Sequence, residues 1–370
     1  ALLTFTQFAP VPKSEFEGID PLQVQQAPFF QHPIGCGPFM VEEVNMKNYT
    51  ILAPFDKYYN GVADYKIQLL PSAGDSDPNV VTRAKSGNLD YGYTKMVADV
   101  QALEGTPGIT VTPIDVRYTR LFYLNKFDKK DGSPAPLADV RVRQALRYAI
   151  DMETICETLF QGSAVPANAL APDANLKGGD LNDYNYNPEK AKELLAEANW
   201  DPNTVIKAVY YYTDQATVDL MTAVQAYLAD VGIKMEFELV EGDLATILWA
   251  APADQTNGPR AVDWDICYAA NAALSLHEYY DRYRTGSPTN SHTPEDAELN
   301  RLIDATNASA DVNAQNEAFK ELIKYENENL FTMALYYQPI FLITSDKIGD
   351  IQKGTPQFCI NWDIQNWNVQ

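Results

Sequence analysis

Histidine, cysteine and long apolar runs are all scarce in the 370-residue sequence. The three histidines stand at 32, 277 and 292, and no two of the four cysteines form a Cys-x-x-Cys pair. Zinc sites and redox-active pairs need such residues at short, regular spacings, so we expect neither a metal nor a cofactor. The sequence also lacks a run of about 18 apolar residues, which argues against a membrane-spanning helix.

Positive charge is scarce as well, since 28 Lys and Arg face 50 Asp and Glu and the formal net charge is −22. A field of this sign repels phosphate backbones and anionic lipid headgroups, so we expect no nucleic-acid partner and no electrostatic membrane contact. The hydrophobic fraction of 46% is that of a folded protein. The chain length suits about two lobes of ordinary domain size.

The motifs of common enzyme classes are missing. The sequence has no Gly-x-Ser-x-Gly, no Walker loop, no Gly-x-Gly-x-x-Gly and no His-Glu-x-x-His. Its 22 tyrosines and 5 tryptophans instead combine an apolar body with a polar tip, which suits solvated binding surfaces. We therefore expect a binding protein and not an enzyme.

The four cysteines are far apart in the sequence. We expect them to be small buried side chains, although one or two disulfides are also compatible with the sequence. They are Cys36, Cys156, Cys267 and Cys359.

Strand and helix patterns alternate along the chain, which is typical of an α/β fold. Residues 120–125 and the apolar stretch 332–344 are predicted strands, and 215–231 is a predicted helix. Residues 138–150 are predicted to form a helix as well, because four apolar residues recur at the i, i+3, i+4, i+7 spacing that places them on one face of a helix. These are Val142, Ala145, Leu146 and Ala149.

Four blocks of this sequence resemble the family 5 extracellular solute-binding proteins of ABC importers, the dipeptide-, oligopeptide- and nickel-binding class. Residues 137–151 match the family signature Asp-x-Arg-Val-Arg-Gln-Ala-hydrophobic-x-x-Ala-Ile-Asp nearly position by position. Residues 33–39 resemble its Gly-Thr-Gly-Pro-Phe/Tyr turn, with Cys36 in place of Thr, and 84–90 and 186–195 carry two further blocks. The arginines of the signature, at 141, 143 and 147, are expected to be solvated or salt-bridged on a helix.

This resemblance implies a bilobed, periplasmic-binding-protein-like α/β fold of class II, cluster C type. It suggests that the chain is the C-terminal portion, without the segment that precedes the Gly-Pro-Phe turn in the family. Residues 1–116 would be the remainder of lobe I, 117–345 the C-terminal α/β lobe II, and 346–370 a return segment to lobe I. Such proteins close two lobes on a hinge and bury the solute in the cleft between them.

The implied role is extracytoplasmic capture of an oligopeptide-like solute and its delivery to the permease subunits of an ABC transporter. The protein would be a monomer, either a cell-surface lipoprotein or periplasmic. Neither a signal peptide nor a lipid-attachment cysteine is visible at the start of the chain, so any membrane contact would use an anchor that this chain lacks.

Candidate ligand-binding residues lie at strand ends and in polar loops of the second lobe. Asp214 could bind a ligand ammonium group, but it is also placed to cap the helix that follows. One of the two tyrosines at 336 and 337 is expected in the core, because alternate strand residues face opposite sides. The candidates are Tyr211, Tyr212, Asp214, Tyr268, Asn271, Tyr336, Tyr337 and Trp362.

The ligand class stays open at this point. Peptide binders of the family carry a Trp and an Asp in the loop that corresponds to 268–274, and dipeptide binders an Arg near 213–216. This sequence has none of them there, which argues against strict dipeptide binding. Longer peptides held by main-chain hydrogen bonds, a neutral solute such as an oligosaccharide, a nickel chelate and a peptide signal read by a receptor are the alternatives.

Overall fold

The chain divides into two units, and the polypeptide crosses between them twice. In the computed structural model, unit 1 is Val116–Pro339, and unit 2 is Leu2–Asp115 with Ile340–Gln370. The structure describes residues 11–45, 47–71, 77–114, 118–172, 176–178, 180–272, 276–349 and 363–370.

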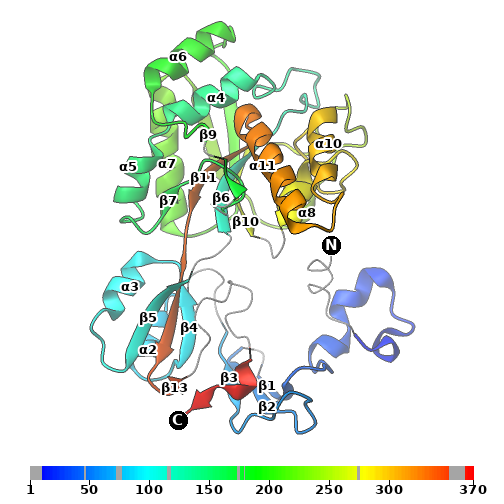
Figure 1. Cartoon of the computed structure of the whole chain (residues 1–370), viewed down its shortest axis with the longest axis vertical. Coiled ribbons are helices and arrows are strands. Elements are labelled where there is room, and N and C mark those ends of the chain that lie inside the picture. Colours follow the sequence, from blue (N-terminus) through cyan, green and yellow to red (C-terminus); the bar gives the residue numbers. More distant parts are fainter. Residues whose placement is uncertain are drawn as a thin grey trace. The chain divides into compact units, whose positions relative to one another are not determined.

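Unit 1 is built on a six-stranded mixed sheet with the order β7-β11-β6-β10-β8-β9 (Figure 1). The central strand β6 pairs antiparallel with β10 and β11, whereas β8 runs parallel to both β10 and β9. The strands are β6 (Tyr118–Leu124), β7 (Val165–Pro166), β8 (Val205–Tyr210), β9 (Lys234–Leu239), β10 (Ile266–Ala272) and β11 (Thr332–Tyr337).

Helices cover both faces of this sheet, so unit 1 has two hydrophobic cores (Figure 1). Phe122 and Leu124 of β6 face one core, and Leu121 and Tyr123 face the other. On the first face lie α4 (Val140–Ala149), α5 (Met152–Thr158), α6 (Pro188–Glu197) and α7 (Gln215–Asp230). On the second lie α8 (Leu244–Trp249), α9 (Leu276–Tyr280), α10 (Ala297–Ala305) and α11 (Val312–Asn329).

The predicted helix over 138–150 is confirmed as α4, and the residues of its apolar face are all buried. The Asp139 carboxylate accepts a hydrogen bond from the Arg141 amide and so caps the helix. The expectation for the signature arginines is wrong for two of the three. Arg141 pairs with Asp139 at the surface, but Arg143 and Arg147 are 5% and 3% exposed.

The predicted strand over 332–344 is two strands, β11 and β12 (Ile340–Ser345), which lie in different sheets. Pro339 stands between them, and proline has no amide hydrogen to donate to a sheet. β12 pairs with β4 (Tyr91–Thr94) and β5 (Ile109–Ile114) of unit 2. Residues 340–345 therefore belong to unit 2, and the lobe boundary expected at 345 is wrong.

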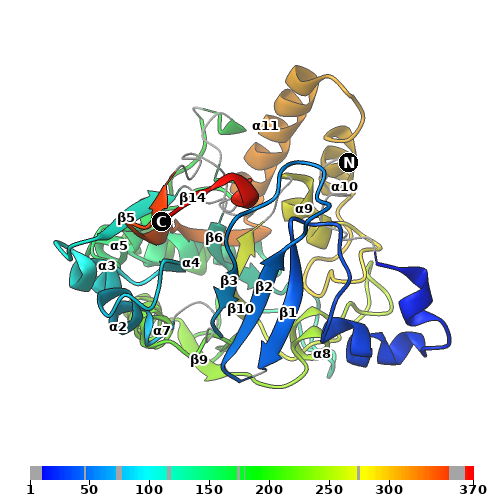
Figure 2. The same ribbon diagram turned by 90° about the horizontal axis from the view of Figure 1, so that it is seen from below.

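Unit 2 contains two three-stranded sheets. In one, β2 (Tyr49–Pro54) lies between β1 (Phe39–Asn45) and β3 (Ile67–Leu69) (Figure 2). In the other, β12 lies between β4 and β5 and packs with α2 (Val80–Lys85) and α3 (Val97–Leu103) around a small core. The short 3₁₀ helices η1 (Lys13–Phe16), η2 (Pro21–Gln26) and η3 (Pro28–Phe30) precede β1.

The end of the chain lies against unit 2 itself. β13 (Ile348–Gly349) pairs with β14 (Asn368–Val369), and the 3₁₀ helix η7 (Ile364–Asn366) precedes β14. The Gln365 amide donates to the Asn60 carbonyl oxygen at 3.2 Å, so the tail is tied to the loop between β2 and β3.

The cysteines behave differently from one another. Cys156 and Cys267 are buried thiols, as expected, and burial raises the pKa of Cys156 to about 12. Cys36 is a free thiol but is exposed, so the expectation is wrong there. Cys359 lies outside the described residues. Within the described ranges, no helix is both long enough and apolar enough to cross a bilayer.

Candidate ligand-binding site

The ends of four strands meet at one edge of the unit 1 sheet. β6 begins there, whereas β8, β10 and β11 end there, because β6 is antiparallel to β10 and β11 and β8 is parallel to β10. The register pairs Tyr118 with Ala272 and Thr119 with Tyr337. We call this edge the strand-end edge. It carries the predicted site residues of unit 1 and is also where β11 leads toward unit 2.

Three tyrosines and an arginine gather at this edge on the α4–α7 face of the sheet. The Tyr268 and Tyr336 hydroxyls are hydrogen-bonded at 2.7 Å, and both side chains are at most 2% exposed. The Tyr212 ring lies edge-on to Tyr268, with 5.7 Å between the ring centroids. The Arg120 guanidinium carbon lies 4.3 Å from the Tyr212 ring centroid and 5.9 Å from that of Tyr268. We call these four residues the Arg120 cluster.

The Arg120 cluster combines one cation with neutral hydroxyls. Burial, followed by the neighbouring Tyr268 and the charge of Asp214, raises the pKa of Tyr336 well above its usual value, while the charge of Arg120 acts in the opposite direction. Tyr336 is therefore un-ionised at neutral pH and can donate its hydroxyl hydrogen. Arg120 is 6% exposed and permanently charged, which makes it the only ionic group of the cluster.

Two of the other predicted tyrosines, Tyr211 and Tyr337, lie on the opposite face of the unit 1 sheet, the face covered by α8–α11. The Tyr211 hydroxyl lies 3.1 Å from that of Tyr212, but Tyr211 packs with the second core. The Tyr337 hydroxyl donates to the Ala169 carbonyl oxygen at 2.7 Å and accepts from Lys177 Nζ at 2.6 Å. Tyr336 is the more deeply buried of the adjacent pair Tyr336 and Tyr337. The two side chains lie on opposite faces of the sheet, as expected for neighbouring residues of a strand.

Asp214 acts as the cap of α7. One of its carboxylate oxygens accepts the Thr217 amide and the other accepts the Thr217 hydroxyl, both at 3.0 Å. The capping alternative is confirmed, and contact between Asp214 and a ligand ammonium group stays a prediction. Asn271 is 8% exposed, and its amide donates to the Tyr279 carbonyl oxygen at 3.4 Å. Trp362 lies outside the described residues.

Sequence reasoning missed Arg120 and Lys177. A single charge at the start of the apolar run Leu121-Phe122-Tyr123-Leu124 was the signal for Arg120, because a cation within a buried strand needs a reason. Lys177 stands in a loop with no local pattern, and only the fold brings it to Tyr337.

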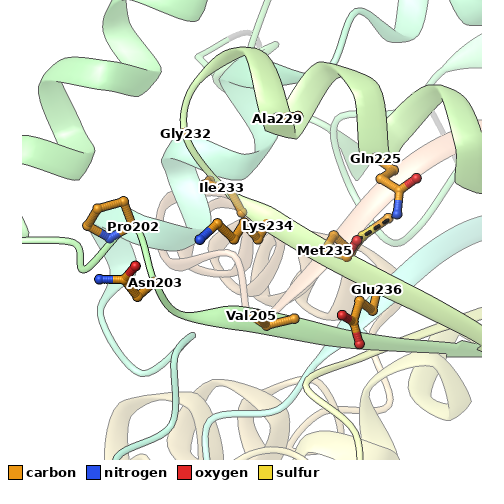
Figure 3. A pocket seen from close by; sticks show the side chains of 10 residues that line it. All are labelled: Pro202, Asn203, Val205, Gln225, Ala229, Gly232, Ile233, Lys234, Met235 and Glu236. Atoms are coloured by element: carbon orange, nitrogen blue, oxygen red, sulfur yellow. Dashed lines mark hydrogen bonds between the residues drawn. The ribbon is translucent and has the colours of Figure 1, made fainter.

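A hollow of about 600 Å³ lies elsewhere, where β8 and β9 begin (Figure 3). Lys234 extends toward the loop of Pro202 and Asn203, and Gln225 donates to the Met235 carbonyl oxygen at 2.7 Å (Figure 3). None of the predicted site residues lines it. It lies at the opposite end of these strands from the Arg120 cluster.

Across the described ranges, no three or more His, Cys, Asp or Glu side chains lie close enough together to hold a metal ion. Burial lowers the pKa of His292 well below its usual value, and this ring lies inside the second core.

Comparison with known proteins identifies a family. The model of the bacterial extracellular solute-binding proteins, family 5 middle, matches residues 2–293. The oligopeptide-binding protein AppA of Bacillus subtilis is 27% identical over 274 residues, 68% of this chain and 46% of that protein. The dipeptide-binding protein of Escherichia coli is 29% identical over 168 residues, 45% of this chain and 30% of that protein. The chain spans less than half the length of these curated relatives.

Solved structures share the fold. The ABC transporter substrate-binding protein CtaP of Listeria monocytogenes has a TM-score of 0.79 and 18% identity, over 99% of this chain and 72% of that one. AppA of Bacillus subtilis in complex with a nonapeptide has a TM-score of 0.76 and 18% identity, over 97% of this chain and 72% of that one. NikZ of Campylobacter jejuni in complex with Ni(L-His) has a TM-score of 0.75 and 17% identity, over 97% of this chain and 72% of that one. The α/β, periplasmic-binding-protein-like fold expected from the sequence is confirmed.

Because the family model covers most of its length, the chain belongs to the family 5 bacterial extracellular solute-binding proteins, which bind solutes outside the cytoplasm and are not enzymes.

Proposed function

We propose that this chain captures an oligopeptide-like solute and delivers it to the permease subunits of an ABC transporter. The observation that carries the proposal is the Arg120 cluster, a set of aromatic hydroxyls and one cation at the strand-end edge of unit 1. Tyr212 is the partly exposed member of this cluster and can offer a ring face and a hydroxyl to a solute, and the cluster holds no nucleophile–base pair or metal with which to transform it. In this proposal the protein works as a monomer, in the periplasm or on the cell surface.

Peptides suit this edge better than single amino acids or dipeptides do. The Asp214 carboxylate accepts two hydrogen bonds from Thr217 at the start of α7, which supports a capping role for it in place of the acidic anchor of a peptide ammonium group. A longer peptide gains affinity from many main-chain hydrogen bonds and depends less on a pair of terminal charges. The family includes relatives named for dipeptides and oligopeptides, and the proposal places this chain with the latter.

The experiment is a thermal-shift and mass-spectrometry screen of the purified protein. Solute that copurifies is released by denaturation and identified by mass, and the stripped protein is then titrated with dipeptides, longer peptides, oligosaccharides and nickel–histidine. We expect longer peptides in excess to raise Tm by roughly 2 °C or more, because ligand binds only the folded state.

The controls divide the alternatives. A Tm rise with oligosaccharides alone would replace the peptide by a neutral solute stacked on tyrosines, and a rise with nickel–histidine alone would replace it by a chelate. No rise with any of these compounds, together with no copurified solute, would contradict solute capture by this chain.

A further inference from the structure

The hollow at the start of β8 and β9 holds charged groups that the proposed peptide site does not use. It measures about 600 Å³, within the range of small-molecule pockets, and all of its lining residues belong to unit 1. Lys234 and Glu236 of β9 line it, and Val205 of β8 is opposite Lys234 in the parallel register. Residues two apart on a strand point to the same side, so both charges lie on the exposed side of β9.

These two charges are not neutralised by the residues that the structure describes. Neither the Lys234 ammonium group nor the Glu236 carboxylate forms an ion pair or a side-chain hydrogen bond with any of them. Lys207, which is opposite Glu236 in the register of β8 and β9, lies 3.1 Å from Glu238 and 3.1 Å from Asp263 and so already has two carboxylate partners. The hollow therefore offers both a cation and an anion to a ligand.

The side-chain amides of the hollow use their hydrogens within the protein. Gln225 donates to a carbonyl oxygen of β9 at 2.7 Å. Asn203 donates to the Asp201 carboxylate twice, from its backbone amide at 2.8 Å and from its side chain at 3.0 Å. This neighbouring acidic group is thus bound to Asn203 and not to Lys234. Among the lining residues, Lys234 is the cation that can meet a carboxylate, and Glu236 is the anion that can meet an ammonium group.

An apolar surface separates the two charges. Lys234 extends toward the loop of Pro202 and Asn203, whereas Glu236 lies on the other side of Val205 from that loop (Figure 3). The Val205 side chain is 38% exposed, so it leaves apolar surface open to a ligand. Two opposite charges with an apolar patch between them match a molecule of the same pattern, because each charge gains a partner and apolar surface is removed from water.

We propose that this hollow binds a small zwitterion with a carboxylate and an ammonium group at the two ends of an apolar body. Lys234 holds the carboxylate, Glu236 holds the ammonium group, and Val205 contacts the body. The ω-amino acids have this form, whereas both charged groups of an α-amino acid share one carbon atom and match the hollow less well. Because the hollow lies at the opposite end of β8 and β9 from the Arg120 cluster, it is a second ligand site, separate from the proposed peptide site.

The first test titrates the unaltered protein with 6-aminohexanoate and measures binding by calorimetry. Hexanoate lacks the ammonium group, hexylamine lacks the carboxylate, and leucine carries both charges on one carbon atom. We expect 6-aminohexanoate to bind with a Kd on the order of 1 mM, since exposed charge contacts and a small apolar area each contribute little. Each of the three analogues should bind at least roughly threefold more weakly, because it loses one of the two charge contacts.

The second test assigns each charge to its end of the ligand. Lys234→Gln and Glu236→Gln alter exposed side chains, and each should weaken 6-aminohexanoate binding at least roughly threefold. Hexylamine should bind Lys234→Gln as it binds the unaltered protein, and hexanoate should do the same with Glu236→Gln. Lys320→Gln and Glu317→Gln make the same chemical changes in an exposed ion pair of α11 and should leave 6-aminohexanoate binding unchanged.

The outcomes separate this second site from the proposed peptide site. A saturating longer peptide should leave 6-aminohexanoate binding unchanged, and loss of that binding in its presence would assign the zwitterion to the peptide site and overturn the inference. No measurable binding of 6-aminohexanoate, equal affinity for hexanoate, or unchanged affinity in both Gln variants of β9 would overturn it as well. Failure of every peptide to bind would contradict the proposed function alone, because the titration of the hollow needs no peptide.

Discussion

Two buried cations of unit 1, Lys126 and Arg143, donate hydrogen bonds to backbone carbonyl groups. Lys126 Nζ donates to the carbonyl oxygens of Leu124 and Phe331 at 2.6 and 2.7 Å. Arg143 donates to three carbonyl oxygens: Leu137 at 2.9 Å, Ala138 at 2.7 Å and Asn329 at 2.7 Å. Burial lowers the pKa of Arg143 to about 10, so it stays charged at neutral pH. Its charge lies against the last residue of α11, where the helix dipole favours a cation.

Arg143→Met should therefore destabilise the protein strongly. The substitution keeps much of the volume but leaves buried carbonyl groups without donors, at a cost of roughly 2–4 kcal/mol in the free energy of unfolding. Arg141→Met is the matched control on the same helix, because Arg141 pairs with Asp139 at the surface and should cost less than about 1 kcal/mol. Equal losses of the free energy of unfolding in the two variants, measured by urea denaturation, would contradict a structural role for the hydrogen bonds of Arg143.

Glu326 of α11 is a buried carboxyl group, 3% exposed, and the Leu170 amide donates to it at 3.4 Å. Burial raises its pKa from 4.5 to about 8, while the Leu170 amide and the charge of Lys177 act in the opposite direction. Between these two values, the folded protein holds a proton that the unfolded chain has released. The free energy of unfolding should therefore fall as the pH rises through this interval and level off above about 8.

Glu326→Gln should remove this dependence. His292 acts in the opposite direction below pH 6.5, since its pKa is lowered by burial and the unfolded chain takes up the proton. Between neutral pH and about 8, a change in the free energy of unfolding is therefore expected to come from Glu326. Urea unfolding across it should show a decline for the unaltered protein and a flat line for Glu326→Gln. The same decline in both proteins would assign it to another group.

Helix caps connect local sequence to the site. The carboxylate of Asp214 starts α7 directly after the end of β8, and that end carries Tyr211 and Tyr212. Asp139 and the Asn187 side chain cap α4 and α6 in the same way. A cap acts on amides only two or three residues ahead, so the capping role of Asp214 could be considered from the local sequence.

Asp214→Ala should lower stability by about 1 kcal/mol, the usual contribution of a cap. Asp214→Ser restores a capping oxygen without the charge and should recover most of the loss. If Asp214 acts only as the cap of α7, longer peptides should bind Asp214→Ser as they bind the unaltered protein. Restored stability with lost peptide binding would instead make Asp214 a ligand contact.

The two units differ in how deeply their sheets are buried. Residues 121–124 of β6 are at most 1% exposed, whereas the described side chains of β1, β2 and β3 include none that is fully buried. The second sheet of unit 2 is intermediate, with Ile343 of β12 fully buried in a small core. Local opening is cheapest where least apolar surface is lost from the interior.

Hydrogen exchange should follow this order. Amides of β1–β3 are expected to exchange at least roughly tenfold faster than those of β6 and β10, and β12 should fall between them. Peptide-resolved exchange followed by mass spectrometry measures all three sheets in one experiment. Uniform protection across the two units would mean that the protein opens only as one cooperative body.

The sequence by itself determined what depends on near neighbours. Caps, apolar faces and turns act within about one helical turn, so α4 and the start of α7 were predictable, and the signature over 137–151 identified the family. Composition also argued against nucleic-acid and anionic-lipid partners, because net charge needs no structure to be counted.

Only the tertiary structure decided what depends on distant segments. Arg120 meets Tyr212, Tyr268 and Tyr336 because β6 lies between β10 and β11 in one particular register. Arg143 is buried because α11 ends against α4, and 332–344 divides at Pro339 because its halves pair in different sheets. These contacts join segments that lie far apart in the sequence. They depend on the apolar surface that all the elements bury together, and no local sequence pattern encodes that.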